Sequence, residues 1–171
     1  MKPDRLDRES KDFDSFLLLV GKLNYAWTNT ESLIIHMIAG LMRTDLETAT
    51  VVFMTLNTSR ARMDLVQRLS KLDRVGSDER NGIIDLTSRM QKLSYLRNRY
   101  NHCIYTFDVN SSMTHTILMR IADRKDVIKM GEMQQVDQKA EDEILETIAK
   151  LAAINQESWQ FFVRHDYPRT A

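Results

Sequence analysis

Apolar residues recur with helical spacing from the start of this chain. In the first part they are Phe13, Phe16, Val20, Leu23, Trp27, Ile34, Ile38 and Leu41. Neighbours in this series mostly stand three or four positions apart, which is the period of one face of an α-helix. The pattern therefore predicts a long first helix over 12–42, with Trp27 in the core.

Capping residues and a change of pattern mark the helices that follow. Asp45 is a suitable N-cap for a second helix, and Asn57 or Thr58 for a third, because their side chains can accept hydrogen bonds from free backbone N–H groups. Gly76 then interrupts the apolar pattern before a fourth helix begins. The expected bounds are 46–56 for the second helix, from 57 or 58 to about 75 for the third, and 78–101 for the fourth.

Beyond the fourth helix the sequence becomes typical of strands. Two segments, 104–109 and 113–121, are rich in β-branched and aromatic residues and flank the polar triplet 110–112, which predicts a β-hairpin. A third strand is expected over 127–130, after a polar turn at 122–126. Helical spacing resumes from 137 to 164.

These elements predict one domain over residues 1–171. Its fold class is mainly α, an antiparallel helical bundle with a small antiparallel hairpin or three-stranded sheet between the fourth and fifth helices. The helical core is expected over 12–102, a β insertion over 103–131 and the last helix over 137–164. The few turn formers, 5 Gly and 2 Pro, argue against an all-β architecture.

Composition narrows the classes of function. The chain has 24 basic and 24 acidic residues, so it lacks the positive excess of a non-specific nucleic-acid binder, and any such contact must be a local patch. The single cysteine excludes an intramolecular disulfide, and the scattered histidines suggest no metal site. No apolar run is long enough to span a bilayer, and the charged N-terminus is unlike a signal peptide. We expect a cytoplasmic protein with no membrane contact, cofactor or metal.

The end of the fourth helix carries the residues with the most distinctive chemistry. Steps of three and four residues back from Arg97 reach an apolar stripe of Leu93, Met90 and Leu86, so Arg97 stands where the core pattern favours an aliphatic side chain. A guanidinium there needs a carboxylate, a phosphate or an interface. Glu31 lies on the stripe of the first helix, and we expect its carboxylate to orient Arg97.

His102 follows Arg97 by five residues, which is about 140° around an ideal helix. The two side chains therefore do not share a face of one straight helix. Either the helix ends near Asn101 and His102 turns, or a second chain completes the site.

The segment Arg97-Asn98-Arg99-Tyr100-Asn101-His102 resembles the signature of the HEPN superfamily. In that signature an Arg and a following polar residue precede a His at a gap of four to six, near the end of a late helix of a helical bundle. Arg97, Asn98 and His102 match its three positions. The resemblance extends over about the first 105 residues as architecture, and the hairpin lies outside the common HEPN core.

The resemblance implies a metal-independent endoribonuclease acting as a homodimer, with two copies of the motif meeting across the interface. RNA carries its own nucleophile, so a His that moves a proton and an Arg that stabilises the charged phosphorane suffice. Arg97, His102 and Asn98 are the expected catalytic residues, with Glu31 and Asn101 in supporting roles. The products would be a 2′,3′-cyclic phosphate and a 5′-hydroxyl. By analogy the setting would be a toxin or antiphage defence effector, with a possible antitoxin or regulatory partner.

Several basic residues near the motif are candidates for contact with the RNA backbone. They are Arg99, Arg120, Arg124 and Lys125. A basic run on the third helix, which includes Arg62, is more typical of a solvated face. Two other functions remain open: a non-catalytic dimerisation module, and a nucleotide- or effector-binding domain that uses the same Arg, Asn and His for a phosphate.

Overall fold

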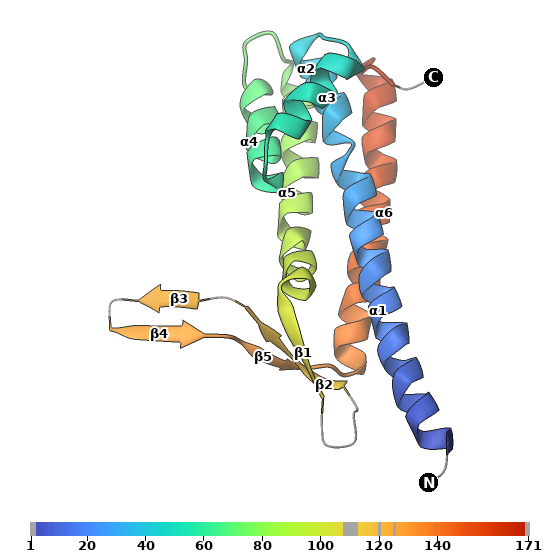
Figure 1. The fold of residues 1–171 in the computed structure, drawn as a ribbon. Coiled ribbons are helices and arrows are strands. Elements are labelled where there is room, and N and C mark those ends of the chain that lie inside the picture. Colours follow the sequence, from blue (N-terminus) through green and yellow to red (C-terminus); the bar gives the residue numbers. More distant parts are fainter. Residues whose placement is uncertain (1–2, 108–112, 120, 125, 170–171) are drawn as a thin grey trace. The chain divides into compact units, whose positions relative to one another are not determined.

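A computed structural model describes residues 3–107, 113–119, 121–124 and 126–169 (Figure 1). Its helices are α1 (Pro3–Glu31), α2 (Ile34–Met42), α3 (Leu46–Thr55), α4 (Ser59–Leu69), α5 (Ser77–Asn101) and α6 (Gln138–Arg164). Its strands are β1 (Cys103–Phe107), β2 (Met113–Leu118), β3 (Ile121–Arg124), β4 (Val127–Met130) and β5 (Met133–Gln135). The prediction of a mainly helical chain with a small antiparallel sheet between the last two helices is confirmed. None of the helices in these ranges has the length and hydropathy that a bilayer span requires.

The residues group into two compact units that alternate along the chain. Unit 1 contains Met1–Tyr25 and Tyr95–Ile148, and unit 2 contains Ala26–Ser94 and Ala149–Ala171. Each of the three longest helices, α1, α5 and α6, therefore contributes residues to both units. The assignment of the whole chain to a single HEPN-like domain stays a prediction.

Unit 2 is helical, and α2 packs against both α3 and α4. Its core is built from large apolar side chains that are almost completely buried, among them Trp27, Ile34, Met37, Ile38, Met63, Ile83 and Phe162. The prediction that Trp27 is a core residue is confirmed, since its side chain is 1% exposed.

The predicted first helix, 12–42, is two helices in the structure. α1 ends at Glu31, and α2 begins at Ile34. Around Ser32 and Leu33 the backbone changes to tighter bonds between residues three apart, such as Leu33 N–H to Thr30 O at 3.2 Å. The Ser32 hydroxyl also donates to Asn29 O at 2.9 Å. Hydroxyl groups that bond to nearby carbonyls compete with the helix ladder, and the apolar spacing did not reveal this.

The capping residues of the next two helices lie where the sequence predicts them. Asp45 accepts a hydrogen bond from Thr48 N–H at 2.7 Å, and Thr58 accepts one from Ala61 N–H at 3.1 Å. The predicted extension of the third helix to about 75 is wrong, because α4 ends at Leu69. The Ser70 carbonyl beyond its end is instead bonded by Arg80 Nε at 3.1 Å, a partner from α5.

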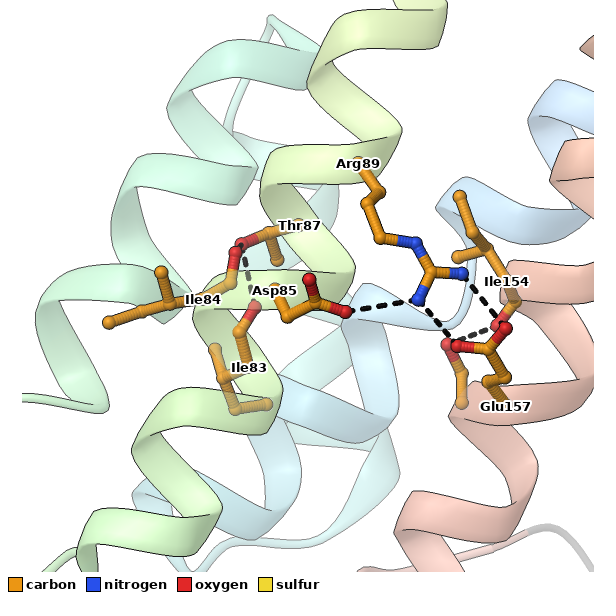
Figure 2. Close-up of polar contacts among 8 residues, drawn as sticks. Ile83, Ile84, Asp85, Thr87, Arg89, Ile154 and Glu157 are labelled. Atoms are coloured by element: carbon orange, nitrogen blue, oxygen red, sulfur yellow. Dashed lines mark hydrogen bonds and ion pairs between the residues drawn. The ribbon is translucent and has the colours of Figure 1, made fainter.

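An ion-pair cluster links α5 and α6 within unit 2 (Figure 2). The guanidinium of Arg89 bonds both oxygens of Glu157, at 2.6 and 2.9 Å, and also Asp85 on its own helix at 3.0 Å. The hydrogen bonds from Arg89 to Glu157 lower the pKa of the Glu157 carboxyl group. The cluster is partly exposed, so we expect a modest contribution to stability.

Unit 1 contains the β structure, and here the predicted strands need correction. β1 and β2 form the expected antiparallel hairpin, but the strand that completes the three-stranded sheet beside β2 is β5, which the sequence analysis missed. The expected third strand, β4, pairs instead with β3 in a separate two-stranded sheet, so the predicted polar turn at 122–126 is wrong for 122–124, which belong to β3. Residues of low strand propensity, such as Ala122 and Asp123, form a strand there because a neighbouring segment satisfies their backbone groups.

Aromatic side chains pack one face of the three-stranded sheet onto α1 and α5. Phe13 on α1 contacts the rings of Tyr105 and Phe107 at centroid distances of 5.9 and 5.2 Å. Phe16 contacts Tyr105 at 6.2 Å and Tyr100 at 5.6 Å. Within unit 1 this packing fixes β1, and with it the end of α5, against α1.

Candidate functional site

The backbone of His102 is held between a helix end and a sheet. α5 ends at Asn101, and the His102 N–H still bonds to Arg99 O at 3.3 Å. The His102 carbonyl accepts a hydrogen bond of 2.8 Å from Met119 N–H, just after β2. The side chain of His102 is exposed. A fixed backbone thus presents the imidazole to solvent, and the prediction that the helix ends near Asn101 is confirmed.

Asn101, the predicted supporting residue, is joined to Asn24 on α1. The two side-chain amides exchange hydrogen bonds, each Nδ2 donating to the other Oδ1 at 2.8 Å. Nδ2 of Asn24 also lies 3.1 Å from the carbonyl of Val20. Sequence reasoning missed the role of Asn24, because polar residues on a helix stripe do not reveal a partner 77 positions away. The pair ties the residue before His102 to a second helix.

Arg97 and Asn98 are linked to each other. Nη1 of Arg97 donates to Oδ1 of Asn98 at 3.0 Å, so the guanidinium extends toward the position of Asn98 on the helix. Asn98 is exposed, and His102 lies four residues further on, just beyond the end of α5. The bond therefore directs the guanidinium toward an exposed residue of the motif.

The buried arginine of the motif is Arg99 rather than Arg97. Arg97 is half-buried, while Arg99 is 4% exposed and lies beside the buried residues Leu96 and Tyr100. The expectation that Arg97 replaces an aliphatic core residue is thus corrected, since this part of α5 buries a different face from its first turns. Nη1 of Arg99 donates to the hydroxyl of Tyr95 at 3.2 Å. Sequence reasoning also missed Tyr95, although a spacing of four residues from Arg99 is a signal for such a contact.

Glu31 makes its ion pair with Arg62, at 3.0 Å from Nη1, and also accepts a hydrogen bond of 2.9 Å from Trp27 Nε1. Nε of Arg62 donates to the carbonyls of Phe53 and Leu56, and its guanidinium lies 4.0 Å from the centroid of the Phe53 ring. The interpretation of the basic run as a solvated face is therefore wrong for Arg62. Glu31, which was expected to pair with Arg97, therefore has Arg62 as an ion-pair partner.

The predicted pairing of Glu31 with Arg97 would join unit 2 to unit 1, and it stays a prediction. Both oxygens of the Glu31 carboxylate already accept hydrogen bonds from Trp27 and Arg62 within unit 2. A role for Glu31 in the site would therefore be additional to this structural one.

Burial controls the ionisation of the groups that follow the motif. It raises the pKa of Tyr100 to about 12 and also raises the pKa of the Cys103 thiol. Cys103 lies 3.4 Å from the Tyr100 carbonyl, and the hydroxyl of Tyr105 donates to the same oxygen. A protonated thiol is a poor nucleophile, so a Cys–His pair with His102 is disfavoured.

The candidates for contact with the RNA backbone have different outcomes. Arg99 is buried, so it does not offer its charge on the surface. Arg124 lies on β3, but its side chain, like all of Arg120 and Lys125, is outside the described residues. In the ranges that the structure describes, no group of three His, Cys, Asp or Glu side chains is arranged to hold a metal ion.

Comparisons of the chain with protein-family models, with curated proteins and with solved structures gave no match.

Proposed function

We propose that the chain is a metal-independent endoribonuclease of HEPN type. The observation that carries the proposal is the hydrogen bond between Arg97 and Asn98, which directs the guanidinium toward an exposed residue that precedes the exposed His102 by four positions. Near one helix end, Asn98 thus anchors the cation of Arg97, and His102 supplies an imidazole. This combination suits the cleavage of a phosphodiester.

The chemistry requires little from the protein because the 2′-hydroxyl of RNA is the nucleophile. His102 removes the proton of this hydroxyl as its oxygen attacks phosphorus, and Arg97 donates hydrogen bonds to the charged phosphorane. The bond from phosphorus to the 5′-oxygen then breaks, and that oxygen takes a proton from a general acid. The products are a 2′,3′-cyclic phosphate and a 5′-hydroxyl.

A homodimer provides both proton-transfer groups. The imidazole that accepts the proton lies near the 2′-oxygen, which attacks phosphorus. The leaving 5′-oxygen is on the opposite side of phosphorus, so this imidazole does not protonate it. A second His102 from a partner copy would serve as the acid. By the HEPN resemblance we further propose a toxin or defence effector acting in the cytoplasm, under the control of an antitoxin or regulatory protein.

The test is cleavage of a mixed RNA pool in EDTA by wild type, Arg97→Ala and His102→Ala. We expect cleavage by wild type alone, with cyclic-phosphate ends. Arg60→Ala is the matched control for the lost charge, because Arg60 is an exposed arginine with a side chain 76% accessible. His115→Ala, on β2, is the control for the lost imidazole. If wild type leaves RNA intact while it is folded, the Arg, Asn and His residues form an interface or a ligand pocket instead.

A further inference from the structure

Tyr95 presents an exposed ring whose hydroxyl is anchored to a buried group. Its side chain is 53% exposed on α5, and its hydroxyl accepts the hydrogen bond of 3.2 Å from Nη1 of Arg99. Arg99 is 4% exposed, so the anchor belongs to the interior of unit 1. A solvent-facing ring held in this way loses little further conformational freedom when a ligand covers it.

Burial of Arg99 as the anchor is energetically unfavourable. Its Nε and Nη2 are buried, and no residue in the described ranges makes a hydrogen bond to either atom. The carboxylate of Glu132 lies 3.9 Å from Nη1 and is 67% exposed. Because burial of an incompletely paired guanidinium is unfavourable, an apolar side chain would serve stability better at this position. Within the part of the chain that the structure describes, the side-chain hydrogen bond of Arg99 goes to the exposed Tyr95, which points to a functional reason for the arrangement.

The ring lies on the same side of α5 as the motif. Tyr95 and Asn98, which holds Arg97, are three residues apart on α5, so they differ by about 60° around the helix and by about 4.5 Å along it. His102 follows directly after the end of the helix at Asn101. A strand whose phosphate is bound at Arg97 and His102 and which continues along this face toward the first turns of α5 would meet the Tyr95 ring.

We propose that Tyr95 is a stacking platform for an unpaired base of the RNA substrate, and that Arg99 is the positioning residue that fixes its ring. This inference rests on the proposed ribonuclease function and adds a residue that contacts a base of the substrate. Aromatic side chains bind splayed, unpaired bases on their faces, whereas bases stacked within a duplex do not offer theirs.

Binding to a probe that cannot be cleaved tests the platform apart from catalysis. The probe is an RNA oligonucleotide that contains the fluorescent base 2-aminopurine. Its 2′-fluoro groups replace the nucleophilic hydroxyls. An abasic 2′-fluoro oligonucleotide of equal length is the control. Loss of one stacked base costs about 1–3 kcal/mol, so we expect Tyr95→Ala to weaken binding of the probe about 5- to 150-fold. The abasic control should bind wild type and Tyr95→Ala equally. Tyr95→Phe keeps the ring and should retain most of the affinity, together with the quenching of 2-aminopurine fluorescence.

Two further variants sharpen the test. Arg99→Met removes the anchor but keeps the interior filled, so binding should weaken less than in Tyr95→Ala and quenching should decrease. Tyr25→Ala removes an even more exposed tyrosine, 73% accessible, from α1 and should leave affinity unchanged. Unchanged binding by Tyr95→Ala, or an equal loss with the abasic oligonucleotide, would overturn the platform.

Cleavage of the same sequence as ordinary RNA separates the two proposals. If wild type cleaves it and Tyr95→Ala cleaves it equally well, the platform is wrong and the ribonuclease stands. If wild type binds the probe through Tyr95 but never cleaves RNA, the platform stands and the ribonuclease is wrong. Absence of binding and of cleavage contradicts both.

Discussion

Asn24 on α1 and Asn101 at the end of α5 exchange two side-chain hydrogen bonds of 2.8 Å. This pair connects two helices of unit 1 at the residue that precedes His102. Because its two ends are 77 positions apart in the chain, it constrains the end of α5 in a way that contacts within α5 cannot.

The amide pair predicts a shared effect on stability and activity. Asn24→Ala removes both hydrogen bonds of the pair, together with the bond to the Val20 carbonyl, and should lower the free energy of unfolding by about 1 kcal/mol. It should also reduce the cleavage rate, because His102 follows the released residue. Urea unfolding and single-turnover cleavage measure the two effects. Asn101→Ala should add little in the double variant, and Lys22→Ala, at an exposed position on α1, is the control. Fully additive losses would contradict the pairing.

Asn98 should act through Arg97. Asn98→Ala removes its hydrogen bond to the guanidinium, and a displacement of about 1 Å near a reaction centre can reduce the rate up to about 100-fold. Stability should change by less than about 0.5 kcal/mol, because Asn98 is exposed. Steady-state kinetics and thermal unfolding measure these quantities. In an Arg97→Ala background the Asn98 substitution should have no further effect on kcat, and a full additional loss there would show that Asn98 acts independently.

The Glu31–Arg62 pair predicts a large loss of stability from either single substitution. Side-chain exposures of 9% for Glu31 and 18% for Arg62 mean that each residue alone would leave a buried charge without its main partner. Glu31→Leu or Arg62→Met should each cost about 3 kcal/mol, and the double variant should recover most of this loss. Arg60→Met on the same helix is the matched exposed control. A double variant that loses the full sum of the two single losses in urea would contradict the pairing.

Tyr100 predicts a loss of stability in alkaline solution. Burial raises its pKa from 10.0 to about 12, so the folded state retains the phenol proton more strongly than the unfolded state does. The corresponding stabilisation is complete below pH 10 and is lost as the pH rises from 10 toward 12. Tyr100→Phe should therefore lose less stability than wild type between pH 9 and 11, measured by urea unfolding.

Both wild type and Tyr100→Phe should still lose some stability in alkaline solution. Burial also raises the pKa of Tyr105 and Tyr167, and Tyr100→Phe keeps both residues. An absorbance titration at 295 nm should show one fewer late-titrating tyrosine in the variant. Identical pH profiles of the two proteins would exclude Tyr100 as a source of the effect.

Local signals along the chain were sufficient for most of the helical structure. Capping by Asp45 and Thr58, the helix that ends at Asn101 and the hairpin after it all follow from chemistry within a few residues. The predictions that failed depend on distant partners. α4 ends early where Arg80 bonds Ser70, and β3 and β5 are strands because neighbouring segments satisfy their backbone groups.

The sequence by itself determined the helix-rich class and singled out Arg97, Asn98 and His102, because helical period, caps and a short motif are encoded within a few turns. Only the tertiary structure decided that Arg99 is the buried arginine, that Arg62 pairs with Glu31 and that Asn24 holds Asn101. A guanidinium or an amide bonds whichever suitable group folding brings within about 3 Å. That choice depends on segments far apart in the chain, and no local pattern specifies it.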